Sequence, residues 1–163
     1  MRKFLVVPIA LALMLGSACY HGSRPRRIGE AAPDFMVQDS DRKVELTQFR
    51  GQVVVLNFWA TWCPPCNEEL PSLISMQERT RARGVVVLGI SIDVDGDAYH
   101  RFLKQRGVNF VTVRDPEEKI SDIYGTHGWP ETFIIDRQGV LRRKVVGPIN
   151  WNSPEITEFL SRL

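Results

Sequence analysis

The chain has 163 residues, of which 44% are hydrophobic and 25% are charged. That length supports one domain with a substantial buried core, and the composition excludes a disordered or low-complexity chain. The formal net charge is +2, and Arg2 and Lys3 at the start of the chain account for the excess of basic residues. The rest of the chain is neutral and has no basic block, which argues against binding to nucleic acid.

The start of the chain resembles an export signal. Its two basic residues precede an apolar run from Phe4 to Leu15, and the small residues Gly16-Ser17-Ala18 follow that run. The run is shorter than the roughly 20 apolar residues of a membrane span. We therefore expect residues 1–19 to be a signal peptide or a membrane or lipid anchor, residues 20–30 a polar tether, and residues 31–163 the folded domain.

Cys19 is the third cysteine of the chain and lies outside any C-x-x-C pair. Because it directly follows Gly-Ser-Ala, it resembles the acylated cysteine of a bacterial lipoprotein, although Gly16 stands where lipoproteins usually carry Leu. A lipid anchor at Cys19, a retained helical anchor and ordinary cleavage all stay open. Each of them places the domain in the periplasm or at the extracytoplasmic face of the membrane, which is an oxidising compartment.

Hydrophobic periodicity predicts that strands alternate with helices after a short hairpin at residues 32–37 and 43–46. The predicted strands are 53–59, 85–92, 110–113, 132–136 and 140–146, and the predicted helices are 64–83, 97–106, 116–124 and 153–163. The continuous apolar run from Val85 to Ile92 is typical of a strand that is covered on both faces. This order predicts an α/β fold with a mixed central sheet flanked by helices.

The most informative motif is Trp62-Cys63-Pro64-Pro65-Cys66, between a predicted strand and a predicted helix. Cys63 would lie at the first turn of that helix, where unpaired N–H groups and the positive end of the helix dipole favour the thiolate over the thiol. Cys66 lies one turn further on and can close a small disulfide with Cys63. A strand, C-x-x-C and a helix are the arrangement of a thiol–disulfide exchange site.

Other roles for these cysteines are weaker. A structural zinc site needs four ligands, but the chain has one cysteine pair, and its three histidines do not form a second ligand pair. A structural disulfide stabilises most when it closes a long loop, and this loop is short. The segment Asp93-Val94-Asp95-Gly96-Asp97 lacks the glycine position of a calcium loop, so helix capping by Asp95 or Asp97 is the better interpretation. We expect neither a metal nor a cofactor.

Three blocks of sequence resemble the thioredoxin superfamily and, within it, the membrane-anchored TlpA/ResA/CcmG (DsbE)-like thiol–disulfide oxidoreductases. The blocks are Asn57-Phe58-Trp59-Ala60-Thr61-Trp62-Cys63-Pro64-Pro65-Cys66, Glu69-Leu70-Pro71 and Gly128-Trp129-Pro130-Glu131-Thr132-Phe133-Ile134-Ile135-Asp136. The resemblance extends from Ala32-Pro33-Asp34-Phe35 to the last helix. It implies a thioredoxin fold with an N-terminal β-hairpin and a central strand–helix insert between Cys66 and Pro130.

The resemblance also implies roles for four residues. Cys63 would be the accessible attacking thiolate, and the more buried Cys66 would resolve the mixed disulfide. Glu69 would tune the pair and take the proton from Cys66, because a partly buried carboxyl has a raised pKa; a solvated helix charge is the alternative. Pro130 would be a cis-proline that faces the cysteines and leaves the preceding backbone free to pair with an extended substrate.

Three further residues would complete the substrate surface. Trp62 beside Cys63 either packs around the site or shapes its contact surface. Trp129 precedes the proline, where relatives often carry a smaller residue. Glu131, directly after the proline, resembles the cytochrome c maturation branch; its alternative is a solvated charge at a strand edge.

We therefore expect an anchored extracytoplasmic enzyme that reduces protein disulfides. Electrons would come from a membrane thiol transporter of the DsbD or CcdA type. They would pass to the haem-attachment cysteines of apocytochrome c or to a maturation carrier. Two alternatives stay open. One is a thiol peroxidase of the peroxiredoxin type, which shares the Ala-Pro-Asp-Phe opening, and the other is a non-catalytic module that binds an apoprotein. The direction of electron flow depends on the reduction potential of the cysteine pair.

Overall fold

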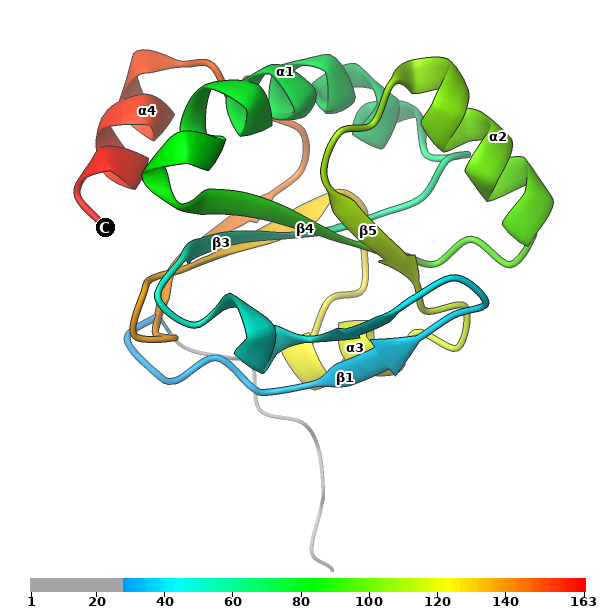
Figure 1. Cartoon of the computed structure of the whole chain (residues 1–163), viewed down its shortest axis with the longest axis horizontal. Helices are drawn as coiled ribbons and strands as arrows, with labels where there is room; N and C mark the ends of the chain where they lie inside the picture. Colours follow the sequence, from blue (N-terminus) through cyan, green and yellow to red (C-terminus); the bar gives the residue numbers. More distant parts are fainter. Residues whose placement is uncertain (1–27) are drawn as a thin grey trace, which may run out of the picture.

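The computed structural model describes residues 28–163, which form a five-stranded mixed sheet and a separate two-stranded hairpin (Figure 1). The hairpin comprises β1 (Met36–Gln38) and β2 (Lys43–Glu45). The sheet comprises β3 (Val53–Trp59), β4 (Val85–Ser91), β5 (Val111–Arg114), β6 (Glu131–Ile135) and β7 (Leu141–Val146), in the order β5-β4-β3-β6-β7. The helices are α1 (Pro64–Thr80), α2 (Gly96–Arg106), α3 (Lys119–Tyr124) and α4 (Pro154–Ser161), with short 3-10 helices at Leu46–Phe49 and Arg81–Arg83.

Strand β3 is the centre of the sheet. It pairs in parallel with β4 and antiparallel with β6, and all seven of its residues are buried. A strand that is covered on both faces needs apolar side chains in both directions, which explains the nearly continuous apolar run in its sequence. Strand β3 ends at Trp59, and the loop 60–63 connects it with helix α1, which begins at Pro64.

Helices α1, α2 and α4 lie on one side of the sheet, and α3 and the hairpin lie on the other (Figure 1). Because successive residues of a strand point to opposite faces, β3 contributes to both cores. Val53 and Val55 pack with buried residues of α1 and α4, whereas Val54, Leu56 and Phe58 pack with buried residues of α3 and the hairpin region. The site described below therefore rests on a strand that is fixed from both sides.

The structure confirms the mixed α/β fold, the N-terminal hairpin and the inserted unit. Between Cys66 and Pro130 the chain forms β4, α2, β5 and α3, which leaves one strand and one helix beyond a minimal thioredoxin fold. Asp95 is the N-cap of α2, and its carboxylate accepts the Ala98 N–H at 2.9 Å, as the capping interpretation predicts.

The predicted helix 116–124 is wrong at its start, because α3 begins only at Lys119. Glu118, the residue before it, has a φ of 57°, so the backbone there is left-handed and cannot continue a helix towards Pro116. The Asp115 carboxylate accepts the Ile120 N–H at 2.7 Å and so caps a shorter helix. A turn occupies the residues that the sequence assigns to the first helical turn.

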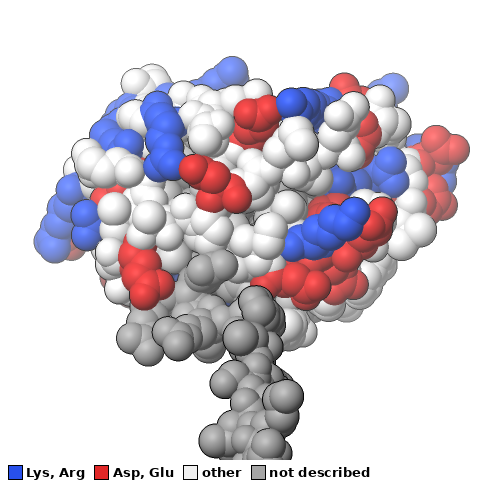
Figure 2. Space-filling view, turned by 90° about the horizontal axis from the view of Figure 1, so that it is seen from below, with Lys and Arg blue, Asp and Glu red and all other residues white. Residues whose placement is uncertain are grey.

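The first residues of the described chain are hydrogen-bonded to strand β7 at the edge of the sheet. The Gly29 N–H donates to the Leu141 carbonyl at 2.8 Å, and the Leu141 N–H donates to the Glu30 carbonyl at 2.9 Å. The expected signal or anchor, including Cys19, lies outside the described residues. In residues 28–163 no helix combines the length and apolar character that a membrane crossing requires. Figure 2 shows acidic and basic side chains interspersed on the face seen from below.

Candidate active site

Cys63 is the N-cap of helix α1, and its sulfur takes the place of the usual capping oxygen. Its Sγ accepts the backbone N–H of Cys66 at 3.3 Å. Pro64 and Pro65 occupy the first two helical positions and have no N–H, so Cys66 provides the first backbone donor of the helix. A thiolate at Cys63 would meet this donor and the positive end of the helix dipole.

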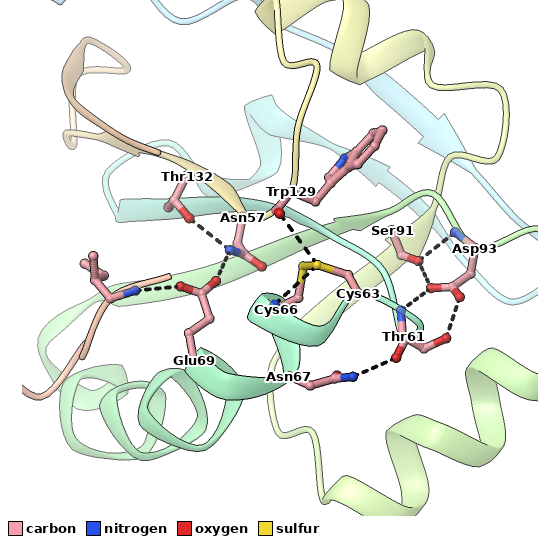
Figure 3. The surroundings of a disulfide bond; sticks show 11 residues. Asn57, Thr61, Cys63, Cys66, Asn67, Glu69, Ser91, Asp93, Trp129 and Thr132 are labelled. Carbon is pink, nitrogen blue, oxygen red and sulfur yellow. Dashed lines mark hydrogen bonds between the residues drawn. A yellow bond between two sulfur atoms is a disulfide. The ribbon is translucent and has the colours of Figure 1, made fainter. Parts of the chain in front are cut away.

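Cys63 and Cys66 form a disulfide with an Sγ–Sγ distance of 2.14 Å and a Cα–Cα distance of 5.3 Å (Figure 3). The two residues are only 4% and 2% exposed, respectively. Both cysteines are therefore buried in this disulfide-bonded form, Cys66 more than Cys63, and the accessibility of the reduced Cys63 thiolate stays a prediction. The cause of the burial is packing, because both cysteines belong to a buried cluster that Trp129 covers in part.

The Trp129–Pro130 peptide bond is cis, as the motif predicts. The Trp129 carbonyl oxygen lies 3.6 Å from the Sγ of Cys63, so the backbone before the proline faces the disulfide. Figure 3 shows this carbonyl pointing at the sulfur pair. The cis-proline segment is thus one wall of the site, and the first turn of α1 is the other.

Glu69 is 4% exposed and is held by neutral donors. Its Oε1 accepts the Asn57 side-chain N–H at 2.9 Å, and its Oε2 accepts the Trp151 indole N–H at 3.1 Å and the Ile149 backbone N–H at 3.4 Å. Burial raises the pKa of the Glu69 carboxyl, and the hydrogen bonds from Trp151, Asn57 and Ile149 oppose that rise. Glu69 is therefore not a solvated helix charge.

Asn57 connects Glu69 with the strand that follows the cis-proline. Its side-chain N–H groups donate to Glu69 and, at 2.9 Å, to the hydroxyl of Thr132 (Figure 3). A groove of about 450 Å³ also reaches Glu69 between α1 and the β7–α4 loop. The residues that line it are Glu68, Glu69, Pro71, Ser72, Pro148, Ile149 and Asn150. The carboxyl is thus buried in a polar network, and the residue that carries it also lines a groove at the surface.

Asp93 holds the loop before the cysteines. Its carboxylate accepts the backbone N–H of Thr61 at 2.9 Å, the hydroxyl of Thr61 at 2.5 Å and the hydroxyl of Ser91 at 2.6 Å. The Thr61 carbonyl in turn accepts the side-chain N–H of Asn67 on α1 at 2.9 Å. The end of β4 and the first turns of α1 therefore fix Thr61, which lies two residues before Cys63 (Figure 3).

Two tryptophans form an aromatic surface beside the disulfide. Trp62 is 61% exposed, and its ring meets that of Trp129 edge to face with centroids 6.3 Å apart. Both rings border a groove of about 550 Å³, which also contains Ile92, Val94 and Ala98. Large exposed apolar side chains next to a reactive group are typical of a surface that contacts another molecule.

Glu131 is placed differently from the other residues of its motif. It is 6% exposed, and its carboxylate pairs with the Lys144 ammonium of β7 at 2.5 Å. The next residue, Thr132, points towards Asn57, so alternation along the strand turns Glu131 to the opposite face of the sheet. The structure brings Cys63, Cys66 and Pro130 together, whereas the carboxylate of Glu131 is engaged elsewhere.

Sequence reasoning missed the roles of Asn57, Asp93 and Trp151. One signal was present for Asn57, because a polar residue inside an otherwise apolar strand needs a buried partner. No local pattern marks Trp151, whose partner lies 82 positions away. Within residues 28–163, no group of three or more His, Cys, Asp or Glu side chains could hold a metal ion.

Comparisons with known proteins agree with this geometry. The sequence matches the AhpC/TSA family over residues 28–144. It is 33% identical over 144 residues to the thiol-disulfide oxidoreductase ResA of Bacillus subtilis, which covers 88% of this chain and 80% of the relative. A ResA of Bacillus cereus is 29% identical over 164 residues, covering 98% of this chain and 94% of the relative.

Solved structures show the same fold. A Chlorobium tepidum protein assigned as the thiol:disulfide interchange protein DsbE is 33% identical and superimposes with a TM-score of 0.73, covering 83% of this chain and 94% of that one. A secreted thiol-disulfide isomerase of Corynebacterium glutamicum is 25% identical with a TM-score of 0.69, covering 79% and 80%. The chain therefore belongs to the AhpC/TSA family of the thioredoxin superfamily, and it is a thiol–disulfide oxidoreductase of the ResA and DsbE kind.

Proposed function

We propose that the protein is an anchored extracytoplasmic reductant of protein disulfides. The observation that carries this proposal is the Cys63–Cys66 pair at the start of α1, opposite the carbonyl that precedes cis-Pro130. Residues 1–19 would supply the export signal or anchor, with Cys19 as the acylation site if the chain is a lipoprotein. In an oxidising compartment such a dithiol works as a reductant only when electrons are supplied to it.

The reaction would begin with the reduced enzyme. The Cys63 thiolate attacks one sulfur of the client disulfide, which forms a mixed disulfide and releases the other client sulfur as a thiolate. Cys66 then loses its proton and attacks Cys63, so the second client sulfur leaves and the Cys63–Cys66 disulfide forms. Two electrons pass to the client, whose two sulfurs each take up a proton.

Glu69 would accept the proton that Cys66 loses. It lies one helical turn after Cys66, and its buried carboxyl has a raised pKa, which brings it closer to that of a thiol. The groove at Ser72 and Ile149 would let water carry that proton away. Proton acceptance by a fixed carboxylate makes the resolving attack independent of free hydroxide.

Trp62, Trp129 and Pro130 would form the contact surface for the client. An extended client segment can pair with the backbone before Pro130 and lay an apolar side chain against the two tryptophans. A role of Glu131 in client choice stays a prediction, because its carboxylate forms an ion pair with Lys144 in this structure. We propose apocytochrome c haem-site cysteines or a maturation carrier as the client, and a thiol transporter of the DsbD or CcdA type as the donor.

A trapping experiment tests the central step. In the reduced Cys66→Ser variant, Cys63 should form a stable mixed disulfide with a client peptide that contains an internal disulfide, because no resolving thiol is present. The Cys63→Ser variant should form none. Equal client reduction by Cys63→Ser and the wild type would contradict the proposal. A reduction potential well below about −200 mV supports the reducing direction, whereas one near −120 mV indicates an oxidant.

Thiol peroxidase activity is the second candidate, because the matched family and the Ala32-Pro33-Asp34-Phe35 opening both suggest it. The geometry favours disulfide exchange, since the Thr61 hydroxyl donates to Asp93 and not to Cys63. Consumption of hydrogen peroxide at a rate above that of protein-disulfide reduction would favour the peroxidase. A protein without a reversible Cys63–Cys66 couple would instead be a binding module.

A further inference from the structure

Trp151 is a buried residue that no sequence motif connects with the cysteines. It is 0% exposed, lies in the loop between β7 and α4, and packs in the same apolar cluster as Leu73 and Met76 of α1. Its indole N–H donates to the Oε2 of Glu69 at 3.1 Å. A tryptophan that serves only for packing does not require a carboxylate as its acceptor.

The loop that carries Trp151 is tied to the backbone of Glu69 itself. The Ser72 hydroxyl donates to the Glu69 carbonyl at 2.8 Å and accepts the backbone N–H of Trp151 at 3.1 Å. The Ile149 N–H of the same loop donates to the Glu69 carboxylate at 3.4 Å. The acceptor and its donors therefore form one unit, and the carboxyl has little freedom to turn away.

Burial disfavours the charged form of Glu69, and these donors are the groups that favour it. Within the described chain, the hydrogen-bond partners of Glu69 come from β3 and the β7–α4 loop, and all of them are neutral. The other titratable groups beside it are Cys66, one turn earlier on α1, and Glu68, which lines the same groove. A neutral N–H donor stabilises the carboxylate more than the carboxylic acid, so each donor favours the charged form.

We propose that Trp151 is a positioning residue for disulfide exchange: its indole N–H fixes the carboxyl of Glu69 in the charged form that can accept a proton. The inference rests on the proposed role of Glu69 as proton acceptor for Cys66. Trp151 itself touches neither the cysteines nor the client. Its contribution reaches the reaction only through Glu69.

A carboxyl titration by NMR tests this inference directly. The oxidised protein is used, with glutamate labelled by ¹³C at its side-chain carboxyl, because disulfide-bonded cysteines do not titrate and cannot perturb the curve. In Trp151→Phe, which removes the N–H donor and keeps most of the apolar ring, the Glu69 midpoint should move to higher pH. An unchanged midpoint in a folded variant would overturn the inference.

A matched control separates the lost hydrogen bond from lost packing. Trp59 is also a buried tryptophan, but its indole N–H donates to the neutral hydroxyl of Thr112 at 3.2 Å. Trp59→Phe should lower the free energy of unfolding and leave the Glu69 midpoint in place. If Trp59→Phe moves the Glu69 midpoint as far as Trp151→Phe does, the effect is general loosening and the inference fails.

A measurement on the native side chain covers the case in which Trp151→Phe does not fold. The indole N–H proton resonance of Trp151 should shift with pH at the same midpoint as the Glu69 carboxyl, and it should not titrate in Glu69→Gln. An indole resonance that ignores the ionisation of Glu69 contradicts the inference.

Kinetics distinguish this inference from the proposed function. In the reduced enzyme, Glu69→Gln should remove the corresponding inflection from the pH–rate profile of mixed-disulfide resolution, and Trp151→Phe should move that inflection to higher pH. An inflection that persists in Glu69→Gln refutes the proton role of Glu69. An altered profile in Glu69→Gln together with a wild-type profile in Trp151→Phe refutes only the role of Trp151.

Discussion

Asp93 shows how a single buried side chain can set the position of the reactive loop. Three donors share its carboxylate, and two of them belong to Thr61. Asp93 is 3% exposed, so in the folded protein these donors have the carboxylate and not bulk water as their acceptor. The residue does not touch the sulfur atoms, yet the loop that it holds leads directly to Cys63.

We predict that Asp93→Ala destabilises the protein by about 3 kcal/mol, because it leaves buried donors without an acceptor. Reduction of the client disulfide should also slow, because Thr61 is no longer held in place and the positions of Trp62 and Cys63 after it become less well defined. Chemical denaturation and a client-reduction assay measure the two effects. Asp95→Ala is the control, because it removes a helix cap from the same loop and should cost only about 1 kcal/mol. Equal stability losses in the two variants would contradict the role of Asp93.

At this scale the sequence predicts the residues that act within a local pattern. Cys63, Cys66 and Pro130 lie in short motifs whose chemistry can be read from neighbouring positions. Trp151 could not be found in this way, because its partner Glu69 is joined to it only by the folded chain. A hydrogen bond over such a sequence distance leaves no periodicity in the sequence.

Strand β4 contains a glycine at a position where a strand normally gains from a side chain. Gly89 is paired with Asn57 of β3 and Thr112 of β5, in the interior of the sheet. A Cβ at this position would lie 2.7 Å from the Thr112 hydroxyl and 2.9 Å from the indole nitrogen of Trp59. The absent side chain makes room for Trp59, which packs in the same cluster as the two cysteines.

Gly89→Ala should therefore destabilise the protein by about 1 to 3 kcal/mol, the usual cost of overpacking a core. The Trp59–Thr112 hydrogen bond should break, which near-ultraviolet circular dichroism can follow through the environment of the indole. Gly128→Ala is a suitable control, because a Cβ there would meet no atom within 4 Å. A Gly89→Ala protein with wild-type stability would show that the strands can move apart to admit the methyl group.

The bounds of the elements were predictable where apolar periodicity is strong. Strand β3 has the predicted bounds, whereas α3 is shorter than predicted. The left-handed backbone at Glu118 explains the failure, because a glutamate gives no local signal for such a conformation. The capping of α3 by Asp115 depends on the turn that this conformation creates.

The whole molecule contains buried carboxyls that respond to pH in opposite directions. Burial raises the pKa of Glu69, so its contribution to stability is present at acid pH and is lost as pH rises through the folded-state value. Burial also acts on Asp136, but hydrogen bonds from the Val140 N–H and Arg142 outweigh it and lower the pKa. The contribution of Asp136 is therefore present at neutral pH and is lost as pH falls.

Two variants should consequently show opposite pH profiles of the free energy of unfolding. Glu69→Gln should gain stability relative to the wild type as pH rises from acid to neutral, because it has no charge to bury. Its amide can be accommodated, since the Gln oxygen accepts from Trp151 and a turned Asn57 amide accepts from the new NH₂ group. Asp136→Asn should lose stability relative to the wild type over the same range. Urea denaturation of the oxidised proteins at several pH values measures both, and parallel profiles would contradict the assignment.

At the scale of the fold, the order of strands and helices follows from apolar runs and turn residues, and the three motif blocks identify the superfamily. The polar network beneath the disulfide does not follow from them. It combines Asn57 of β3, Glu69 of α1 and Trp151 of the β7–α4 loop. These residues come together only when α1 and the β7–α4 loop are packed on the sheet.

The groove at the two tryptophans and the groove at Glu69 have separate linings. The groove at Trp62 and Trp129 shares no lining residue with the groove at Glu69 and Ser72. A client that docks on the tryptophans, as we propose, would therefore leave the groove at Glu69 open. Under the proposed mechanism, the release of the proton from Glu69 and the departure of the client need no fixed order. The size of the client should therefore affect its binding affinity and not the rate at which Glu69 loses the proton that it takes from Cys66.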